Sequence, residues 1–138
     1  MAIRTPPQKA DRKTAPRLPR KVKATLADFQ RRVLELFPGE ISQLILYGSY
    51  ARGDAKPDSD VDVIVVVKWN EERLPDGAYV APISDPRWQA IINAAADSLL
   101  AFGLEVAPFV VSEQRFREGF PLANRAKREG MRLWPRLN

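Results

Sequence analysis

Apolar residues follow two different spacings along this chain, and these spacings predict its elements. In residues 22–37 and 86–102 they recur three or four positions apart, which is the period of a helix with one buried face. Residues 41–47, 61–67 and 104–111 are short runs rich in apolar and β-branched side chains, which predicts strands. The run at 61–67 is almost wholly apolar, as expected when both sheet faces are covered or one face holds a metal site.

Turn and capping residues mark the ends of these elements. Pro38-Gly39 ends the first helix. Asp85 is typical of a helix cap, Pro86 of a first helical position, and Gly103 of a helix end. The buried side of this second helix is predicted to consist of Trp88, Ile91, Ile92, Ala95, Leu99 and Phe102.

The last third of the chain is predicted to form short elements. Ser112 is a candidate cap for a short helix, Pro121 starts another, Gly130 ends it, and residues 131–134 are extended. Together with the earlier order of helix, strand, strand, helix and strand, this predicts an α/β (α+β) fold. We expect a small mixed sheet with helices packed mainly on one face.

Charge divides the chain into two parts. The chain has 138 residues, which is enough for one domain with a modest core. Its net charge is +5. Residues 1–22 are basic and rich in proline, and are predicted to be a disordered arm, while residues 23–138 form the domain. The arm is either a solvated extension or a tail that binds nucleic acid or a partner.

The composition removes several classes of chemistry. The chain has no cysteine and no histidine, which excludes thiol nucleophiles, Ser-His-Asp triads and histidine-based zinc sites. Its longest apolar run, residues 63–67, is too short to span a bilayer, and no secretory signal is visible, so we expect a cytoplasmic protein without membrane contact.

One motif carries most of the chemical information. Gly48-Ser49 is followed, after ten residues, by Asp60 and Asp62 at the start of an apolar strand. Aspartates two apart on a strand point to the same face, where their oxygens can hold Mg²⁺. A Gly-Ser turn lets backbone amides approach a phosphate. Arg52 and Lys56, in the intervening loop, are candidates for further phosphate contacts.

This Gly-Ser…Asp-x-Asp pattern resembles the minimal nucleotidyltransferase group of the DNA polymerase β-like nucleotidyltransferase superfamily. The resemblance covers residues 24–134 and implies the same fold outline. It implies that Asp60 and Asp62 are catalytic ligands of two Mg²⁺ ions, and that Gly48 and Ser49 bind the phosphates of a nucleoside triphosphate, expected to be ATP.

The third metal-binding acid of such enzymes is an open question here. The superfamily usually carries it on a neighbouring strand, and the resemblance places it near position 107, which is Ala107 in this chain. Glu105 is the only acid in that strand, so it is the candidate third catalytic and metal-binding residue. The alternative is that Glu105 lies in water at the strand entrance, which would leave catalysis slow or absent.

Two main functions are compatible with these features, and a third is weaker. The first is a Mg²⁺-dependent transfer of NMP, expected to be AMP, to an acceptor hydroxyl. The resemblance implies that the acceptor is a small helical HEPN-type protein, which this chain restrains as an antitoxin. The second is a binding module that neutralises a helical partner without catalysis. The third is RNA binding through residues 1–22.

Overall fold

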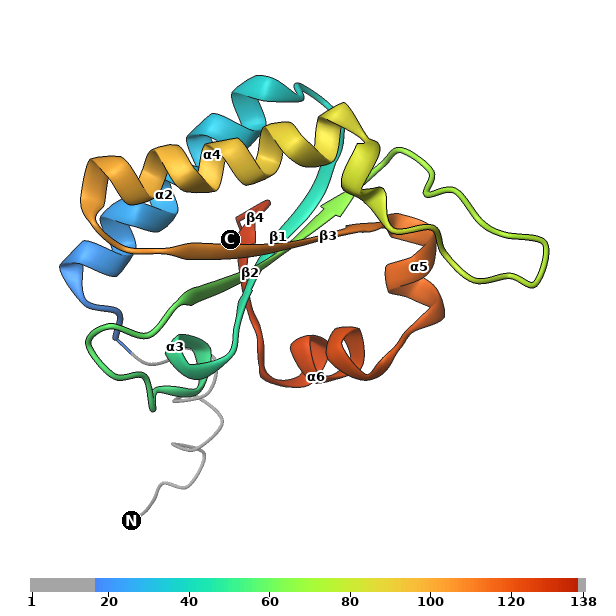
Figure 1. The fold of residues 1–138 in the computed structure, drawn as a ribbon. Coiled ribbons are helices and arrows are strands. Elements are labelled where there is room, and N and C mark those ends of the chain that lie inside the picture. The colour runs from blue at the N-terminus through green and yellow to red at the C-terminus, as the bar shows by residue number, and fades with distance from the viewer. Residues whose placement is uncertain (1–16, 137–138) are drawn as a thin grey trace, which may run out of the picture.

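The computed structural model describes residues 17–136, which form one sheet and two layers of helices (Figure 1). In chain order the elements are α2 (Arg20–Leu36), β1 (Ile41–Tyr47), α3 (Ser49–Arg52), β2 (Val61–Val67), the 3₁₀ turn η1 (Pro82–Ser84), α4 (Pro86–Phe102), β3 (Val106–Ser112), α5 (Glu113–Glu118), α6 (Pro121–Glu129) and β4 (Met131–Trp134). The predicted strands at 41–47 and 61–67 are confirmed with their bounds, and the third begins two residues later than predicted.

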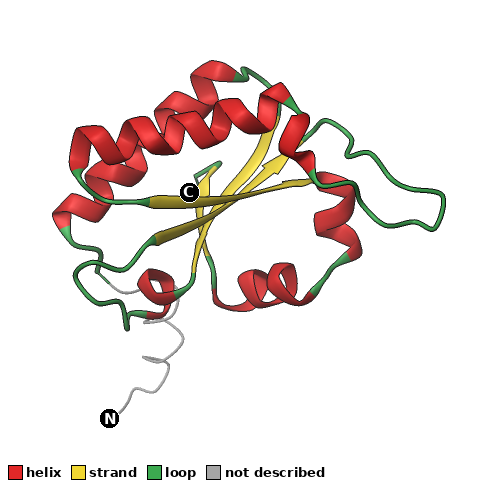
Figure 2. Cartoon of the chain, viewed as in Figure 1, coloured by secondary structure: helices red, strands yellow, loops and turns green. Residues whose placement is uncertain are grey.

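The sheet is mixed, as predicted, with the strand order β3-β2-β1-β4 (Figure 2). Strand β1 is antiparallel to both β2 and β4, whereas β2 and β3 are parallel. The end of β1 therefore lies at the same edge as the starts of β2 and β3. In this register Tyr47 is opposite Asp62, and Asp62 is beside Ala107.

Helices cover both faces of the sheet, with the longer pair on one side. Alternate residues of β2, including Val63 and Val65, face α2 and α4, while Ile64 and Val66 face the shorter helices α5 and α6. This two-sided burial explains why β2 is almost wholly apolar. The capping predictions are also confirmed, since Asp85 accepts a hydrogen bond from the Arg87 amide and Ser112 from the Arg115 amide.

The structure differs from the predictions in the start of α2 and in the buried side of α4. Helix α2 begins at Arg20, so the last residues of the predicted arm belong to it, and residues 1–16 lie outside the described residues. In α4 the predicted buried side was partly wrong, because Leu99 and Phe102 are 39% and 37% exposed. Ala94 and Ser98 are buried instead, together with Ile91 and Ala95, which were predicted correctly.

The buried side of α4 differs from the prediction because α4 packs against α2. The Ser98 hydroxyl donates a 2.8 Å hydrogen bond to Asp28, whose carboxylate also accepts one from Arg32 at 2.7 Å. The hydrogen bond from Arg32 lowers the pKa of Asp28, against the opposing effect of burial. Small residues on α4 let the two helices approach closely, so the larger Leu99 is left at the edge.

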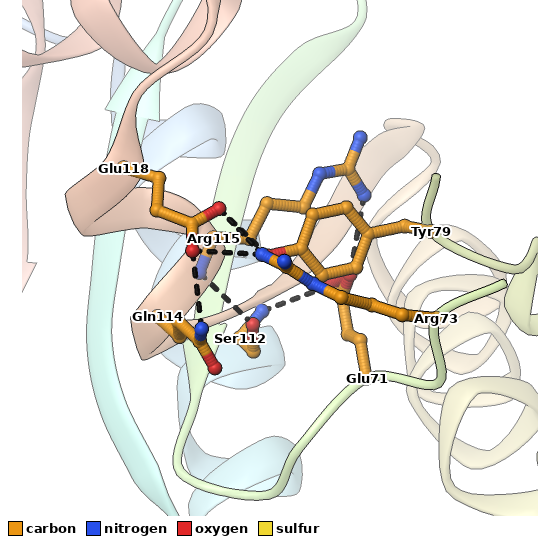
Figure 3. A network of polar contacts seen from close by, with 7 residues as sticks. All are labelled: Glu71, Arg73, Tyr79, Ser112, Gln114, Arg115 and Glu118. Atoms are coloured by element: carbon orange, nitrogen blue, oxygen red, sulfur yellow. Dashed lines mark hydrogen bonds and ion pairs between the residues drawn. The ribbon is translucent and has the colours of Figure 1, made fainter. Parts of the chain in front are cut away.

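A polar network fixes the long loop between β2 and α4 to the second helix layer (Figure 3). Arg73 and Tyr79, which form a short bridge, both bind Glu118 of α5. The Glu71 carboxylate accepts hydrogen bonds from the Ser112 amide and from Arg115, at 2.8 and 3.3 Å. The Arg115 guanidinium also lies over three aromatic rings, those of Tyr79, Phe109 and Phe120.

Helix α6 is held against the sheet at both ends. At its start, the Phe120 ring contacts Phe109 of β3, with 5.8 Å between the ring centroids. At its end, Gly130 packs so closely that a Cβ atom there would lie 2.4 Å from the Ala126 carbonyl oxygen and 2.7 Å from Ile45 Cγ2. None of the helices formed by residues 17–136 is long and apolar enough to span a membrane.

Replacing Gly130 with alanine should loosen α6 from β1. Because the added methyl group meets both backbone and a buried side chain, we expect a loss of about 1–3 kcal/mol of unfolding free energy. Urea denaturation of Gly130→Ala against wild type measures this. The neighbouring exposed change Glu129→Ala is the control, and equal stability of the two variants would contradict the packing argument.

Candidate active site

The centre of the motif is a contact between Gly48 and Asp62. Gly48 has φ +79°, a conformation that favours glycine, and a Cβ atom there would lie only 2.3 Å from Asp62 Oδ2. The contact arises because Gly48 follows Tyr47, the residue opposite Asp62 in the β1–β2 pair. The carboxylate therefore lies directly against the Gly-Ser turn, which unites the two halves of the motif.

The turn leads into the short helix α3. Gly48 and Ser49 supply the carbonyl oxygens that accept the Arg52 and Gly53 amides, at 3.0 and 2.9 Å. No side chain caps the start of this helix. Since the first amides of a helix have no partner within it, those from Ser49 onward are suited to bind an anion.

The loop from α3 to β2 is braced by the buried side chain of Tyr50. Its hydroxyl donates a 3.2 Å hydrogen bond to the Lys56 carbonyl oxygen. Lys56 and Ser59 close a turn, because the Ser59 amide donates to the same carbonyl and its hydroxyl accepts from the Lys56 amide. This brace sets the position at which Asp60 enters the site, and its only signal in the sequence is the place of Tyr50 beside the motif.

The two aspartates share a local excess of negative charge. Burial raises the pKa of Asp62, the nearby charge of Asp60 raises it further, and Arg52 partly opposes both effects. Burial, and then the charge of Asp62, raises the pKa of the Tyr47 hydroxyl. Adjacent carboxylates that repel one another are the donor set that a divalent cation stabilises, so Asp60 and Asp62 fit a Mg²⁺ ion.

The two predicted phosphate-binding cations are placed differently. Arg52 lies at the end of α3, within reach of Asp62 electrostatically, and forms an exposed ion pair with Asp54 at 3.3 Å. Such an exposed pair is weak and can exchange for a phosphate. Lys56 lies on the outer turn of the loop and its side chain is exposed. Contacts of either residue with phosphate stay predictions.

Glu105, the candidate third acid, does not form one cluster with Asp60 and Asp62. Glu105 is exposed just before β3, and its carbonyl oxygen accepts the Val61 amide at 2.9 Å, which places it beside Asp60 along the strand pair. Within residues 17–136 no three acidic side chains come together in a group that could hold a metal ion. The position directly beside Asp62 is Ala107. The role of Glu105 therefore stays a prediction.

A hollow of about 450 Å³ lies at the opposite end of β2 and shares no residue with the motif. Its lining includes Trp69, Arg87 and Trp88. Arg87 lies 4.5 Å above the Trp69 ring and binds Asp85, so the cation in the lining already has a partner. The motif site is defined by its carboxylates and turn rather than by this hollow.

Comparison with known proteins decides the family. A model of the nucleotidyltransferase domain matches residues 26–122, well over half of the chain. The chain belongs to this nucleotidyltransferase family. The matched segment includes Gly48, Ser49, Asp60, Asp62 and Glu105.

Curated relatives of this nucleotidyltransferase come from the archaeon Methanocaldococcus jannaschii. One, named "Putative protein adenylyltransferase MJ0604", is 27% identical over 93 residues, which are 67% of this chain and 76% of the relative. A second protein with the same kind of name is 40% identical over 43 residues, but the match covers only 43% of its length.

Solved structures with a similar course of the chain were also found. One is a toxin-antitoxin crystal structure with AMP-PNP, at TM-score 0.47 and 19% identity, covering 77% of this chain and 70% of that one. Another, from Sulfolobus solfataricus, is named a "putative nucleotidyltransferase", at TM-score 0.46 and 17% identity, covering 87% and 91%. These scores lie below 0.5, and nothing about the site or its function follows from them.

Replacing Asp62 with asparagine should stabilise the metal-free domain and abolish its response to Mg²⁺. A carboxyl whose pKa is raised by folding favours the folded state below that pKa and destabilises it as the pH rises through it. The asparagine variant has no carboxyl group to ionise at this position, so it does not lose folding stability in this way at neutral pH. Thermal unfolding between about pH 4 and pH 8, with and without MgCl₂, measures both effects.

Asp60→Asn is the matched control, since it removes the same charge from an exposed position. It should change the metal-free stability less than Asp62→Asn. If Asp62→Asn instead lowers the melting temperature at neutral pH without metal, the electrostatic description of this carboxylate is wrong.

Proposed function

We propose that this nucleotidyltransferase transfers AMP from ATP to a hydroxyl group on a partner protein, with Mg²⁺ held by Asp60 and Asp62. The observation that carries the proposal is the contact between the Asp62 carboxylate and Gly48. The contact supports the proposal because nucleotidyl transfer needs metal-binding acids and a phosphate-binding turn side by side.

The residues divide the work between binding and orientation. The amides that follow Gly48 and the Ser49 hydroxyl bind the outer phosphates, and Arg52 adds a charged donor. Bound Mg²⁺, in one or two ions, would neutralise the negative charge of the phosphates. The acceptor hydroxyl loses its proton to water as its oxygen forms a bond to the α-phosphorus, the bond from that phosphorus to the β-phosphate oxygen breaks, and pyrophosphate leaves.

A protein acceptor is supported by the names of the relatives, which describe protein adenylyltransferases. Within this class, the resemblance of the motif at residues 48–62 to the minimal nucleotidyltransferases favours a small helical HEPN-type partner. This chain would then act as an antitoxin that modifies its partner.

A second candidate function has its own supporting observation. Ala107 occupies the position beside Asp62, and Glu105 is exposed outside any group of three acids among the described residues. A weakened metal site favours a binding module that restrains its partner by complex formation alone. The two functions differ in whether covalent label appears on the partner.

Label transfer tests the choice directly. The full chain is incubated with candidate HEPN-type partner, MgCl₂ and each α-³²P-labelled nucleoside triphosphate, and label on protein is followed by gel electrophoresis. We expect transfer from ATP that falls at least a hundredfold in Asp60→Asn and Asp62→Asn, because the metal ligands act in the reaction itself. Asp58→Asn, an exposed loop acid, is the control.

Transfer to the partner that is unaffected by either motif variant would contradict the assignment of Asp60 and Asp62. A tight complex without transfer, unchanged in both variants, would replace the enzyme by the binding module. Label on RNA would show that the acceptor is a nucleic acid and not a protein.

Restoring an acid at position 107 should strengthen the site. Because Ala107 is the neighbour of Asp62 in the parallel register, Ala107→Asp places a carboxylate about 5 Å away on the same face. We expect tighter Mg²⁺ binding, measured by calorimetry, and faster transfer. If Glu105 already serves as the third ligand, Glu105→Gln lowers transfer and Ala107→Asp restores it in the double variant, whereas no effect of either change would exclude a third acid on β3.

A further inference from the structure

Helix α6 crosses the sheet face that carries Asp62. Its buried residues Ala123 and Ala126 pack in one cluster with Ile45 and Ile64. Asp62 precedes Ile64 by two positions on β2 and therefore points to the same face. Figure 1 shows α3 and α6 on the side of the sheet opposite α2 and α4. The edge of α6 that faces the start of β2 is thus next to the proposed active site.

The contacts of Lys127 show how α6 is oriented about its axis. Its ammonium group donates a 2.8 Å hydrogen bond to the Phe116 carbonyl oxygen and lies 4.8 Å from the centre of the Phe116 ring. Phe116 belongs to α5, which follows Ser112, and Ser112 is beside Val67 at the end of β2 farthest from Asp62. The Lys127 side of α6 therefore faces away from the active site.

The opposite side of α6 carries Arg125. Two residues along a helix are separated by about 200° around its axis, so Arg125 and Glu129 both lie nearly opposite Lys127. Leu122, on the same edge, is partly buried in the cluster that contains Tyr47, the partner of Asp62 in the β1–β2 register. This edge of α6 therefore faces the site, with Arg125 in its middle.

Arg125 is available for a ligand. Its side chain is exposed, and none of the ion pairs formed among residues 17–136 involves it. Arg125 belongs to α6, a different element from α3 and β2, which carry Arg52 and Asp62. Such a position suits the outer part of a bound triphosphate, whose charge extends well beyond the α-phosphate.

We propose that Arg125 of α6 binds the outer phosphates of the nucleoside triphosphate, in addition to Arg52. This inference rests on the proposed function, since it assigns a further residue to the same substrate. It gives the basic helix α6 a role in nucleotide binding, with a guanidinium fork matched to phosphate oxygens.

Equilibrium binding of ATP, ADP and AMP to the full chain, measured by calorimetry with MgCl₂ and without acceptor, tests the assignment. We expect Arg125→Gln to weaken ATP binding by about tenfold or more while leaving AMP binding unchanged, and Arg125→Lys to recover part of the loss. Arg117→Gln is the control that removes the same charge, because Arg117 is exposed on α5, which follows Ser112 at the end of β2 farthest from Asp62. Thermal unfolding confirms that each variant is folded.

The outcomes separate the two proposals. If wild type binds no ATP, the proposed function fails before Arg125 is tested further. If wild type binds ATP and Arg125→Gln matches Arg117→Gln, only the assignment of Arg125 is wrong. An equal loss for ATP and AMP would also overturn it, since the outer phosphates would not then be the group that Arg125 contacts.

Discussion

The close contact between Gly48 and the Asp62 carboxylate is the constraint on which the site depends. It requires the antiparallel register of β1 and β2, a left-handed backbone at Gly48, and the absence of a side chain there. Each requirement is met by a different part of the structure. The register comes from apolar packing on both faces of β2, and the backbone conformation from the turn into α3. A carboxylate held this way has its pKa raised by burial and by Asp60, which is a state that a divalent cation relieves.

The two helix layers have different roles around this contact. Helices α2 and α4 form the larger core, where small residues of α4 and the bonds of Asp28 set their separation. The layer of α5 and α6 is thinner and is held by Arg115, Gly130 and the polar network of the long loop. Since this second layer covers the face that carries Asp62, its position determines which side chains surround a bound nucleotide.

The two proposed functions differ in whether a third carboxylate joins Asp60 and Asp62, and β3 itself carries no acid. Membership of the nucleotidyltransferase family gives the type of chemistry, but the family match does not specify the carboxylate that Ala107 lacks. The backbone of Glu105 is joined to the start of β2 by one hydrogen bond, which the Val61 amide donates to the Glu105 carbonyl oxygen. The Glu105 side chain is exposed. A longer side chain at the strand entrance has more freedom than a short acid beside Asp62, so any contribution to metal binding carries a larger entropic cost.

Local patterns in the sequence predicted the strands β1 and β2, the caps at Asp85 and Ser112, and the pairing of Gly48-Ser49 with Asp60 and Asp62. These depend on neighbours a few residues apart, or on chemistry that a short motif carries whole. The tertiary structure alone decided which side of α4 is buried, that Asp62 contacts Gly48, and that Lys127 of α6 binds α5. Those outcomes depend on packing between segments far apart in the chain, where the shapes of both partners determine the orientation, and periodicity within one segment cannot specify it.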